Sequence, residues 1–249
     1  MAVEINLENK VALVTGGTRG IGKAIVNELL QSGAKVFATG TNLIQVEKLN
    51  KENKNSLLTY LQLDLSEPNN VRKFISKTLK VTDIDILVNN AGINKVSDAD
   101  IISDEEFLQI QEINVHGPFL LAQAFGKQML NKNWGRIINI SSIWGVVTRP
   151  GRLSYSASKM AILGISKTLA VEWAKNNVLV NSVSPGFTLT ELTKTTNTKQ
   201  ELKEIKNKIP QNRLALPEEI AKGVLFLSSN LNSYIVGQNL IIDGGYTAI

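Results

Sequence analysis

The sequence has no cysteine and one histidine, His116, and aromatic residues make up 6% of its 249 residues. Without cysteine the chain can form neither a disulfide framework nor a Cys/His zinc site. No apolar run approaches the roughly 18 residues that a membrane helix needs, so we expect no membrane segment. The start, MAVEINLENK, lacks the apolar core of a signal peptide. We therefore expect a cytoplasmic protein.

The excess of positive over negative charge is also small. Lys and Arg number 27 and Asp and Glu 22, which gives a formal net charge of +5. The basic residues form no arginine-rich block and no pattern interleaved with aromatic residues. This distribution is typical of a solvated surface and argues against nucleic-acid binding. Apolar residues at 43% and charged residues at 20% are typical of a globular protein.

Short β-branched runs alternate along the chain with segments long enough for helices, such as 24–31 and 105–130. Near-continuous apolar strands separated by helices favour a parallel sheet with helices on both faces. Right-handed crossovers then predict a doubly wound α/β Rossmann fold. No linker divides the chain, so we expect residues 1–249 to form a single domain. The predicted strands are 11–15, 35–39, 57–63, 84–88, 136–140, 178–183 and 240–242.

Residues 190–208 form a long polar insert after the sixth predicted strand, with the sequence TELTKTTNTKQELKEIKNK. Such an insert is either a lid over a substrate or an exposed pair of helices. Pro217, followed by two glutamates, predicts the start of the next helix.

The first predicted strand leads into the glycine-rich sequence TGGTRGIG at 15–22. Glycines at 16, 20 and 22 permit a tight turn and let backbone N–H groups approach a pyrophosphate at a helix N-terminus. The alternative is a glycine-rich turn without a ligand. The position between a strand and a helix favours a dinucleotide site.

The end of the second predicted strand indicates which dinucleotide binds. An acidic residue there would bind the adenosine ribose of NAD. The chain instead has Thr41 and Asn42 at this point, and the first acidic residue after the strand is Glu47. Arg19, within the glycine-rich loop, and Thr41 are candidates to bind an additional 2′-phosphate. The sequence therefore predicts NADP(H) rather than NAD(H), although Arg19 can also be a solvated side chain.

Ser142 ends the fifth predicted strand, and Tyr155 and Lys159 follow 13 and 17 residues later. The four-residue spacing places Tyr155 and Lys159 on one face of a helix. An ammonium at ~4 Å favours a phenolate by roughly 4 kcal/mol, or about 3 pK units, at an intermediate dielectric. Tyr155 would then titrate near neutrality and exchange a proton with a substrate oxygen that Ser142 also binds.

With these motifs the whole chain resembles a short-chain dehydrogenase/reductase, and within that family the bacterial 3-oxoacyl-acyl-carrier-protein reductases. The resemblance rests on TGGTRGIG at 15–22, Tyr155-x-x-x-Lys159, Asn114, Ser142, and Asp64-Leu65, Asn89-Asn90-Ala91-Gly92, Pro185-Gly186, Gly237-Gln238-Asn239-Leu240 and Asp243-Gly244-Gly245.

The resemblance implies a seven-stranded parallel sheet, a homotetramer and roles for individual residues. Tyr155 would be the general acid/base, Lys159 would lower its pKa and bind the nicotinamide ribose, Ser142 would orient the carbonyl, and Asn114 would complete a proton relay. The implied cofactor-binding residues are Gly16, Thr18, Arg19, Gly20, Ile21, Gly22, Thr41, Asp64, Leu65, Asn90, Ala91, Gly92, Tyr155, Lys159, Pro185, Gly186 and Thr188.

The chain departs from the acyl-carrier reductases at the arginines that are thought to meet the acidic carrier protein. Asn133 and Asn176 occupy the matching positions, and Lys132 and Lys175 stand beside them. Lysine lacks the bidentate fork of arginine, so docking of a carrier protein is left open.

Three further residues are candidate substrate contacts: Trp144, Arg152 and Phe187. Arg152, together with Arg149, could recognise a carboxylate or phosphate on the substrate. The alternative, which the sequence slightly favours, is an arginine that faces solvent or another subunit.

The sequence thus predicts an NADPH-dependent reductase that converts a ketone, preferably a 3-oxoacyl thioester, to a secondary alcohol. The alternatives are a sugar, a steroid or a small anionic ketone as substrate. A non-catalytic dinucleotide sensor is a third hypothesis, which the presence of Tyr155 and Lys159 disfavours.

Overall fold

The computed structural model describes residues 4–191, 193 and 198–249. Its centre is one parallel sheet with the strand order β3-β2-β1-β4-β5-β6-β7. Each predicted strand range overlaps one observed strand, so the predicted α/β Rossmann fold is confirmed. The strands are β1 (Val11–Val14), β2 (Lys35–Gly40), β3 (Leu58–Gln62), β4 (Ile86–Asn89), β5 (Gly135–Ile140), β6 (Val178–Pro185) and β7 (Asn239–Ile242).

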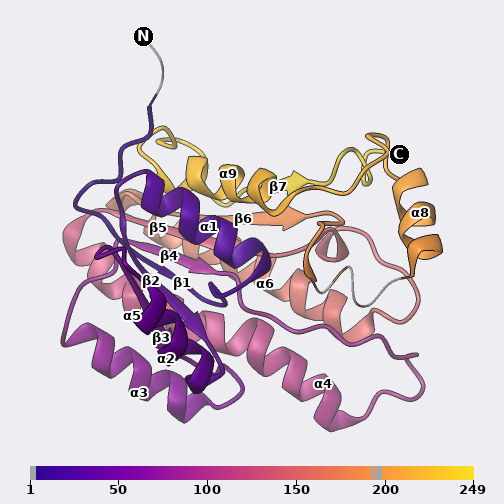
Figure 1. Ribbon diagram of the computed structural model, residues 1–249, viewed down its shortest axis with the longest axis horizontal. Helices are drawn as coiled ribbons and strands as arrows, with labels where there is room; N and C mark the ends of the chain where they lie inside the picture. Colours follow the sequence, from indigo (N-terminus) through magenta and orange to yellow (C-terminus); the bar gives the residue numbers. More distant parts are fainter. Residues whose placement is uncertain (1–3, 192, 194–197) are drawn as a thin grey trace.

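Helices cover both faces of the sheet (Figure 1). On one face, α1 (Gly20–Gln31) and α9 (Pro217–Ser228) pack on the sheet, and on the other α3 (Pro68–Leu79), α5 (Gly117–Lys132) and α6 (Leu153–Trp173) do so. The strands are buried on both sides because their apolar residues alternate between two core clusters. Leu13 and Val14, adjacent in β1, contribute to opposite clusters. Strands of this kind show no polar face, as the sequence predicted.

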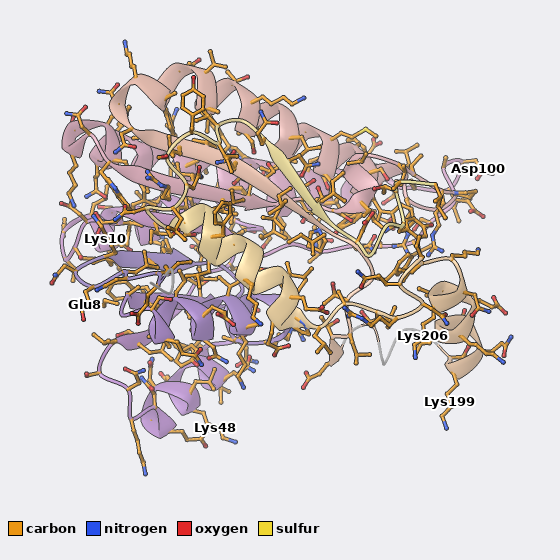
Figure 2. The ribbon with its side chains drawn as sticks, turned by 90° about the horizontal axis from the view of Figure 1, so that it is seen from above. Glu8, Lys10, Lys48, Asp100, Lys199 and Lys206 are labelled. Atoms are coloured by element: carbon orange, nitrogen blue, oxygen red, sulfur yellow. The ribbon has the colours of Figure 1, made fainter. Side chains whose placement is uncertain are left out.

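The order of the strands reverses between β1 and β4, which are neighbours in the sheet. In open parallel sheets the carboxyl ends of the strands at such a point form a crevice that binds ligands. The glycine-rich loop follows β1 and Asn90 follows β4, so both lie at this crevice. In Figure 2, Glu8 and Lys10 lie at one end of the molecule. Helix α8 (Lys199–Asn207), which carries Lys199 and Lys206, lies at the other end, as does Asp100.

The segment 105–130 is not the uninterrupted helix that the sequence predicted. It contains α4 (Asp104–Gln111), a π-helical turn (Glu112–His116) and α5. Pro118 stands four residues after Asn114 and has no N–H to donate to its carbonyl, which disturbs a regular α-helix at this point. Hydrophobic periodicity does not reveal a single wide turn, and such turns are frequent at functional sites.

The helix predicted at Pro217 is confirmed as α9, and α2 (Leu43–Glu52) packs on β2 and β3. Of the predicted insert 190–208, residues 192 and 194–197 lie outside the described residues, so the hypothesis of a lid stays a prediction. Among the helices in the described part of the chain, none has both the length and the apolar character needed to cross a membrane.

Candidate active site

The loop between β1 and α1 has the geometry of an anion-binding turn. Gly16 and Gly20 have φ angles of +65° and +54°, in the left-handed region that glycine adopts without strain. Arg19 precedes α1, and its side chain makes no capping hydrogen bond to the first turn. The backbone N–H groups of that turn are therefore available to a negatively charged group, which the helix dipole also attracts.

Asn90 holds the glycine-rich loop against the end of β4. Its Nδ2 donates hydrogen bonds to the carbonyl oxygens of Thr15 at 2.9 Å and Gly16 at 3.2 Å. Its backbone N–H donates to Thr15 Oγ1 at 2.9 Å. Gly22 lies directly against the atoms of this hydrogen bond: a Cβ added there would lie 2.2 Å from Gly16 O and 2.5 Å from Asn90 Nδ2. The third glycine of the motif thus permits the close approach of the two loops.

A groove of about 400 Å³ runs along these loops at the carboxyl edge of the sheet. Its lining includes every residue that the resemblance implied for the loop and for the ends of β2, β3 and β4. It also includes residues that the sequence did not single out, among them Thr39 and Ile113, because nothing in their local pattern marks a side chain that faces a groove. The predicted residues in the lining are Gly16, Thr18, Arg19, Gly20, Ile21, Gly22, Thr41, Asp64, Leu65, Asn90, Ala91 and Gly92.

The adenosine end of the groove carries no acidic side chain at the end of β2. Asn42 there accepts a hydrogen bond from the Gln45 N–H at 2.9 Å and begins α2. Arg19 and Thr41 are exposed and line the groove. Asp64, after β3, accepts hydrogen bonds from the N–H and the hydroxyl of Ser66 at 2.9 and 2.8 Å, which orients its carboxylate. The residues of the groove fit a nicotinamide dinucleotide.

The predicted catalytic residues lie together beside this groove. Tyr155 and Lys159 both belong to α6, and the Lys159 Nζ lies 5.5 Å from the centroid of the Tyr155 ring. Lys159 is 4% exposed, and its Nζ donates a hydrogen bond to Ile140 O at 2.9 Å. Ser142, which follows β5, lies close enough to the Tyr155 phenol to lower its pKa. The structure thus brings Ser142, Tyr155 and Lys159 into one cluster.

Asn114 joins this cluster through the π-helical turn. Its Nδ2 donates to Ile93 O at 2.9 Å and to Ser158 Oγ at 3.0 Å, and its Oδ1 accepts from the Ile93 N–H at 2.9 Å. A Cβ added to Gly92 would lie 3.0 Å from Asn114 Oδ1 and 3.5 Å from Lys159 Nζ. Gly92 therefore connects the lining of the groove to the catalytic cluster.

The protonation of the cluster differs from the sequence-based prediction. Burial raises the pKa of Tyr155, and this effect outweighs the lowering by the Ser142 hydrogen bond and by the charge of Arg152. Burial also lowers the pKa of Lys159 to about 8. The prediction that Tyr155 titrates near neutrality is therefore wrong for the ligand-free protein. The residue spacing predicts the charge effect of the ammonium on the phenol. It does not predict the removal of both groups from water, which disfavours the charged form of each.

The remaining predicted cofactor residues lie at the end of β6. Pro185 is the last residue of the strand, and Thr188 is 5% exposed, with its hydroxyl donating to Gly186 O at 3.1 Å. A Cβ added to Gly186 would lie 2.7 Å from the Cα of Asp243. This segment is therefore packed tightly against the chain that follows β7.

The predicted substrate residues lie against one another. Trp144 and Phe187 are in edge-to-face contact, and each also meets Tyr246, which the sequence analysis missed because it lies about 60 residues further along the chain. Arg152 is partly exposed, and its Nε and Nη1 atoms are buried without a hydrogen-bond partner among the described residues. The choice between a substrate contact and an arginine that faces solvent or another subunit stays a prediction.

The two positions that would carry carrier-docking arginines are paired with each other. Asn176 Nδ2 donates to Asn133 Oδ1 at 2.8 Å. Lys132, the nearby candidate replacement, forms ion pairs with Asp83 at 3.0 Å and Asp85 at 3.3 Å. Its charge is therefore already balanced within the chain.

Comparisons with known proteins agree with this geometry. A family model described as Enoyl-(Acyl carrier protein) reductase matches residues 16–247. A 3-oxoacyl-(acyl-carrier-protein) reductase FabG of Aquifex aeolicus is 39% identical over 248 residues, which cover 98% of this chain and 99% of the relative. An NAD-dependent glycerol dehydrogenase of Listeria innocua is 38% identical over 245 residues, with 98% and 96% of the two chains covered.

Solved structures superpose on nearly the whole chain. A putative gluconate dehydrogenase from Agrobacterium tumefaciens matches with a TM-score of 0.94 at 26% identity and full coverage of both chains. A gluconate 5-dehydrogenase from Burkholderia cenocepacia, in complex with NADP and tartrate, matches with a TM-score of 0.92 at 29% identity, with 98% of this chain and 97% of that chain covered.

The chain belongs to the short-chain dehydrogenase/reductase family. It is an oxidoreductase that acts on alcohol or ketone groups, and its family binds nicotinamide dinucleotides.

We predict that Gly22→Ala weakens NADPH binding at least about tenfold and lowers Tm, because the added methyl group collides with backbone and with Asn90. Gly164→Ala is the matched control: a Cβ at this helical position has no neighbour within 4 Å, so Tm should be unchanged or slightly raised. Fluorescence titration and thermal unfolding measure both variants. Wild-type affinity in Gly22→Ala would contradict the role of the close contact.

Proposed function

We propose that the protein uses NADPH to reduce a ketone to a secondary alcohol, with Tyr155 as the proton donor. One observation carries the proposal: the buried Lys159 Nζ lies 5.5 Å from the centroid of the Tyr155 ring, and Ser142 acts on the same phenol, beside the groove at the ends of the strands. A substrate carbonyl placed at Ser142 and Tyr155 meets two hydrogen-bond donors at one oxygen. The bound dinucleotide supplies the hydride.

The roles of the individual side chains follow from their environment. A raised pKa keeps Tyr155 protonated at neutral pH, which suits a proton donor in the direction of reduction. The ammonium of Lys159 lowers the free energy of the phenolate that remains after the transfer, and it can also bind the ribose of the dinucleotide. Asn114, on its π-helical turn, is suited to a relay that returns a proton toward Lys159.

NADP(H) is our proposed cofactor because of the charges around the adenosine end of the groove. The end of β2 has no carboxylate that would repel a 2′-phosphate, and Arg19 and Thr41 line the groove there. The relatives include both cofactors, since the Listeria protein is named as NAD-dependent and the Burkholderia structure contains NADP.

A 3-oxoacyl thioester is the substrate class that the names of several relatives at 38–39% identity support. The Asn133–Asn176 pair and the neutralised Lys132 do not reproduce the cationic docking positions for a carrier protein. We therefore propose that a thioester substrate is accepted without strong dependence on the carrier.

A short oxo acid is the second candidate substrate. Two of the similar solved structures are named as dehydrogenases of gluconate, a hydroxy acid, and one of them contains tartrate. The two buried guanidinium nitrogen atoms of Arg152, beside Tyr155, are the observation that favours this class.

The homotetramer stays a prediction from the resemblance. Large apolar side chains on α4 and α6 are exposed in the single chain, with Leu108 at 62% and Val171 at 83%. Light scattering of the purified protein would test the assembly, and a monomer at micromolar concentration would contradict it.

Tyr155→Phe tests the proposed reaction directly, because it keeps the ring and removes the proton donor. We expect kcat with acetoacetyl thioester or a small ketone to fall at least about 100-fold, while NADPH binding measured by fluorescence stays within about threefold. Retained turnover would show that another group donates the proton. A dinucleotide sensor would bind NADPH and show no turnover even in the wild-type protein.

The pH dependence of kcat/KM for NADPH should report Lys159, because this parameter reflects groups of the ligand-free enzyme. The ammonium is charged below its pKa of about 8 and neutral above it, so kcat/KM should be high near pH 7 and fall above about pH 8. Lys159→Arg keeps the charge at all these pH values. An unchanged descending limb in this variant would exclude Lys159 as its origin.

Arg19→Ala tests the choice of cofactor. If Arg19 binds the 2′-phosphate, the KM for NADPH should rise roughly tenfold while the KM for NADH changes less than about threefold. Steady-state kinetics with both cofactors on one ketone measure this difference. A wild-type protein that prefers NADH would contradict the proposed cofactor.

A further inference from the structure

Two nitrogen atoms of the Arg152 guanidinium, Nε and Nη1, are buried without a counter-ion, in a side chain that is partly exposed as a whole. No hydrogen bond within residues 4–191, 193 and 198–249 satisfies its Nε or Nη1 atom. Desolvation lowers the pKa of Arg152, and among the charged groups that shift it there is no carboxylate. Residues 1–3, 192 and 194–197 include no Asp or Glu. A buried cation without a partner is costly, so the site favours an anion that comes from outside the chain.

A second arginine increases this cost. The guanidinium carbons of Arg149 and Arg152 lie 5.2 and 5.8 Å from the centroid of the same ring, that of Trp144. The charge of Arg149 lowers the pKa of Arg152, which is the effect of two like charges close together. An indole attracts each cation only weakly. An anion bound beside Arg152 would offset the repulsion between the two guanidinium groups.

The unpaired guanidinium lies next to the groups that hold the reacting carbonyl. Arg152 immediately precedes α6, one turn before Tyr155, and its charge acts on the Tyr155 phenol. Trp144, the ring beneath it, donates its backbone N–H to Ser142 Oγ at 3.1 Å. A carbonyl oxygen at Ser142 and Tyr155 therefore leaves the adjoining part of the same substrate close to Arg152.

Apolar rings form the wall of this part of the site. The ring centroids of Trp144, Phe187 and Tyr246 lie 5.4 to 6.2 Å apart in edge-to-face pairs. Rings of this kind exclude water and strengthen an ionic hydrogen bond between an arginine and an anion. A single buried cation among rings suits a substrate with one negative charge and a short carbon skeleton.

We propose that Arg152 is the specificity-determining residue of the substrate site and binds the carboxylate of a short oxo acid, with Ser142 and Tyr155 binding its carbonyl. The proposal rests on the proposed ketone reduction and names the substrate class for it. A planar carboxylate accepts two parallel hydrogen bonds from a guanidinium. The carboxylate is unchanged in the reaction, since hydride and proton are added only to the carbonyl group.

The experiment compares acids with neutral analogues of the same shape. Pyruvate, acetoacetate and levulinate separate the carbonyl from the carboxylate by increasing lengths, and each is paired with its methyl ester. NADPH oxidation is measured for wild type, Arg152→Gln and Arg152→Lys. The matched control is Arg72→Gln, which removes an exposed arginine on α3 at the same cost in net charge.

We expect wild type to prefer at least one acid over its ester by roughly 10- to 100-fold in kcat/KM, as for a charge-assisted hydrogen-bond pair. Arg152→Gln should abolish this preference mainly through a higher KM for the acid, so that kcat/KM falls at least about tenfold more for the acid than for its ester. Arg152→Lys, which keeps the charge and loses the fork, should retain part of the preference. Arg72→Gln should match wild type.

Two kinds of failure are distinguishable. If no acid is preferred over its ester, if only the thioester turns over, or if the preference survives in Arg152→Gln, the assignment of Arg152 is overturned and the ketone reduction stands. If wild type reduces none of the acids, esters or thioesters with NADPH or NADH, the proposed function itself is overturned. NADPH binding to Arg152→Gln, measured by fluorescence, separates a local effect from misfolding.

Discussion

The buried ammonium of Lys159 is the constraint on which the rest of the site depends. Removing this group from water lowers its pKa to about 8, and the only protein oxygen to which it donates among the described residues is the carbonyl of Ile140. The same burial raises the pKa of Tyr155. Burial thus disfavours the charged form of both groups, the phenolate of Tyr155 and the ammonium of Lys159. In the proposed reaction the ammonium of Lys159 stabilises the phenolate that Tyr155 leaves after it donates its proton, which requires the two groups to stay close together.

The fold provides this burial without occupying the groove. Helix α6 packs on β6 and β5 and places Lys159 at the carboxyl end of β5, and the π-helical turn before α5 brings Asn114 to the same point. The glycine-rich loop and Asn90 meet at the reversal of strand order, where the described residues leave a groove of about 400 Å³. Cofactor groove and proton-transfer cluster therefore share one border, at Gly92.

Substrate recognition rests on a different principle from catalysis. The side chains of Asn114 and Lys159 have hydrogen-bond partners within the chain, whereas Arg152 has two buried nitrogen atoms that lack a partner in the described part of the chain. A buried polar group without a hydrogen-bond partner either destabilises the folded protein or binds a ligand. Trp144 lies under the Arg152 guanidinium and contacts Phe187 and Tyr246, so the proposed anion site adjoins an apolar cluster of rings.

Much of this molecule is determined by local sequence. Apolar runs, glycine spacing and the Tyr155–Lys159 interval predicted the strands, the phosphate loop and the shared helix face, because each depends on backbone geometry within a few residues. Tertiary structure decided what depends on burial and on contacts between distant segments: the direction of the Tyr155 pKa shift, the π-helical turn at Asn114, the enclosure of Arg152 and the approach of Tyr246. Desolvation is a property of the packed molecule, so no interval between residues can report it.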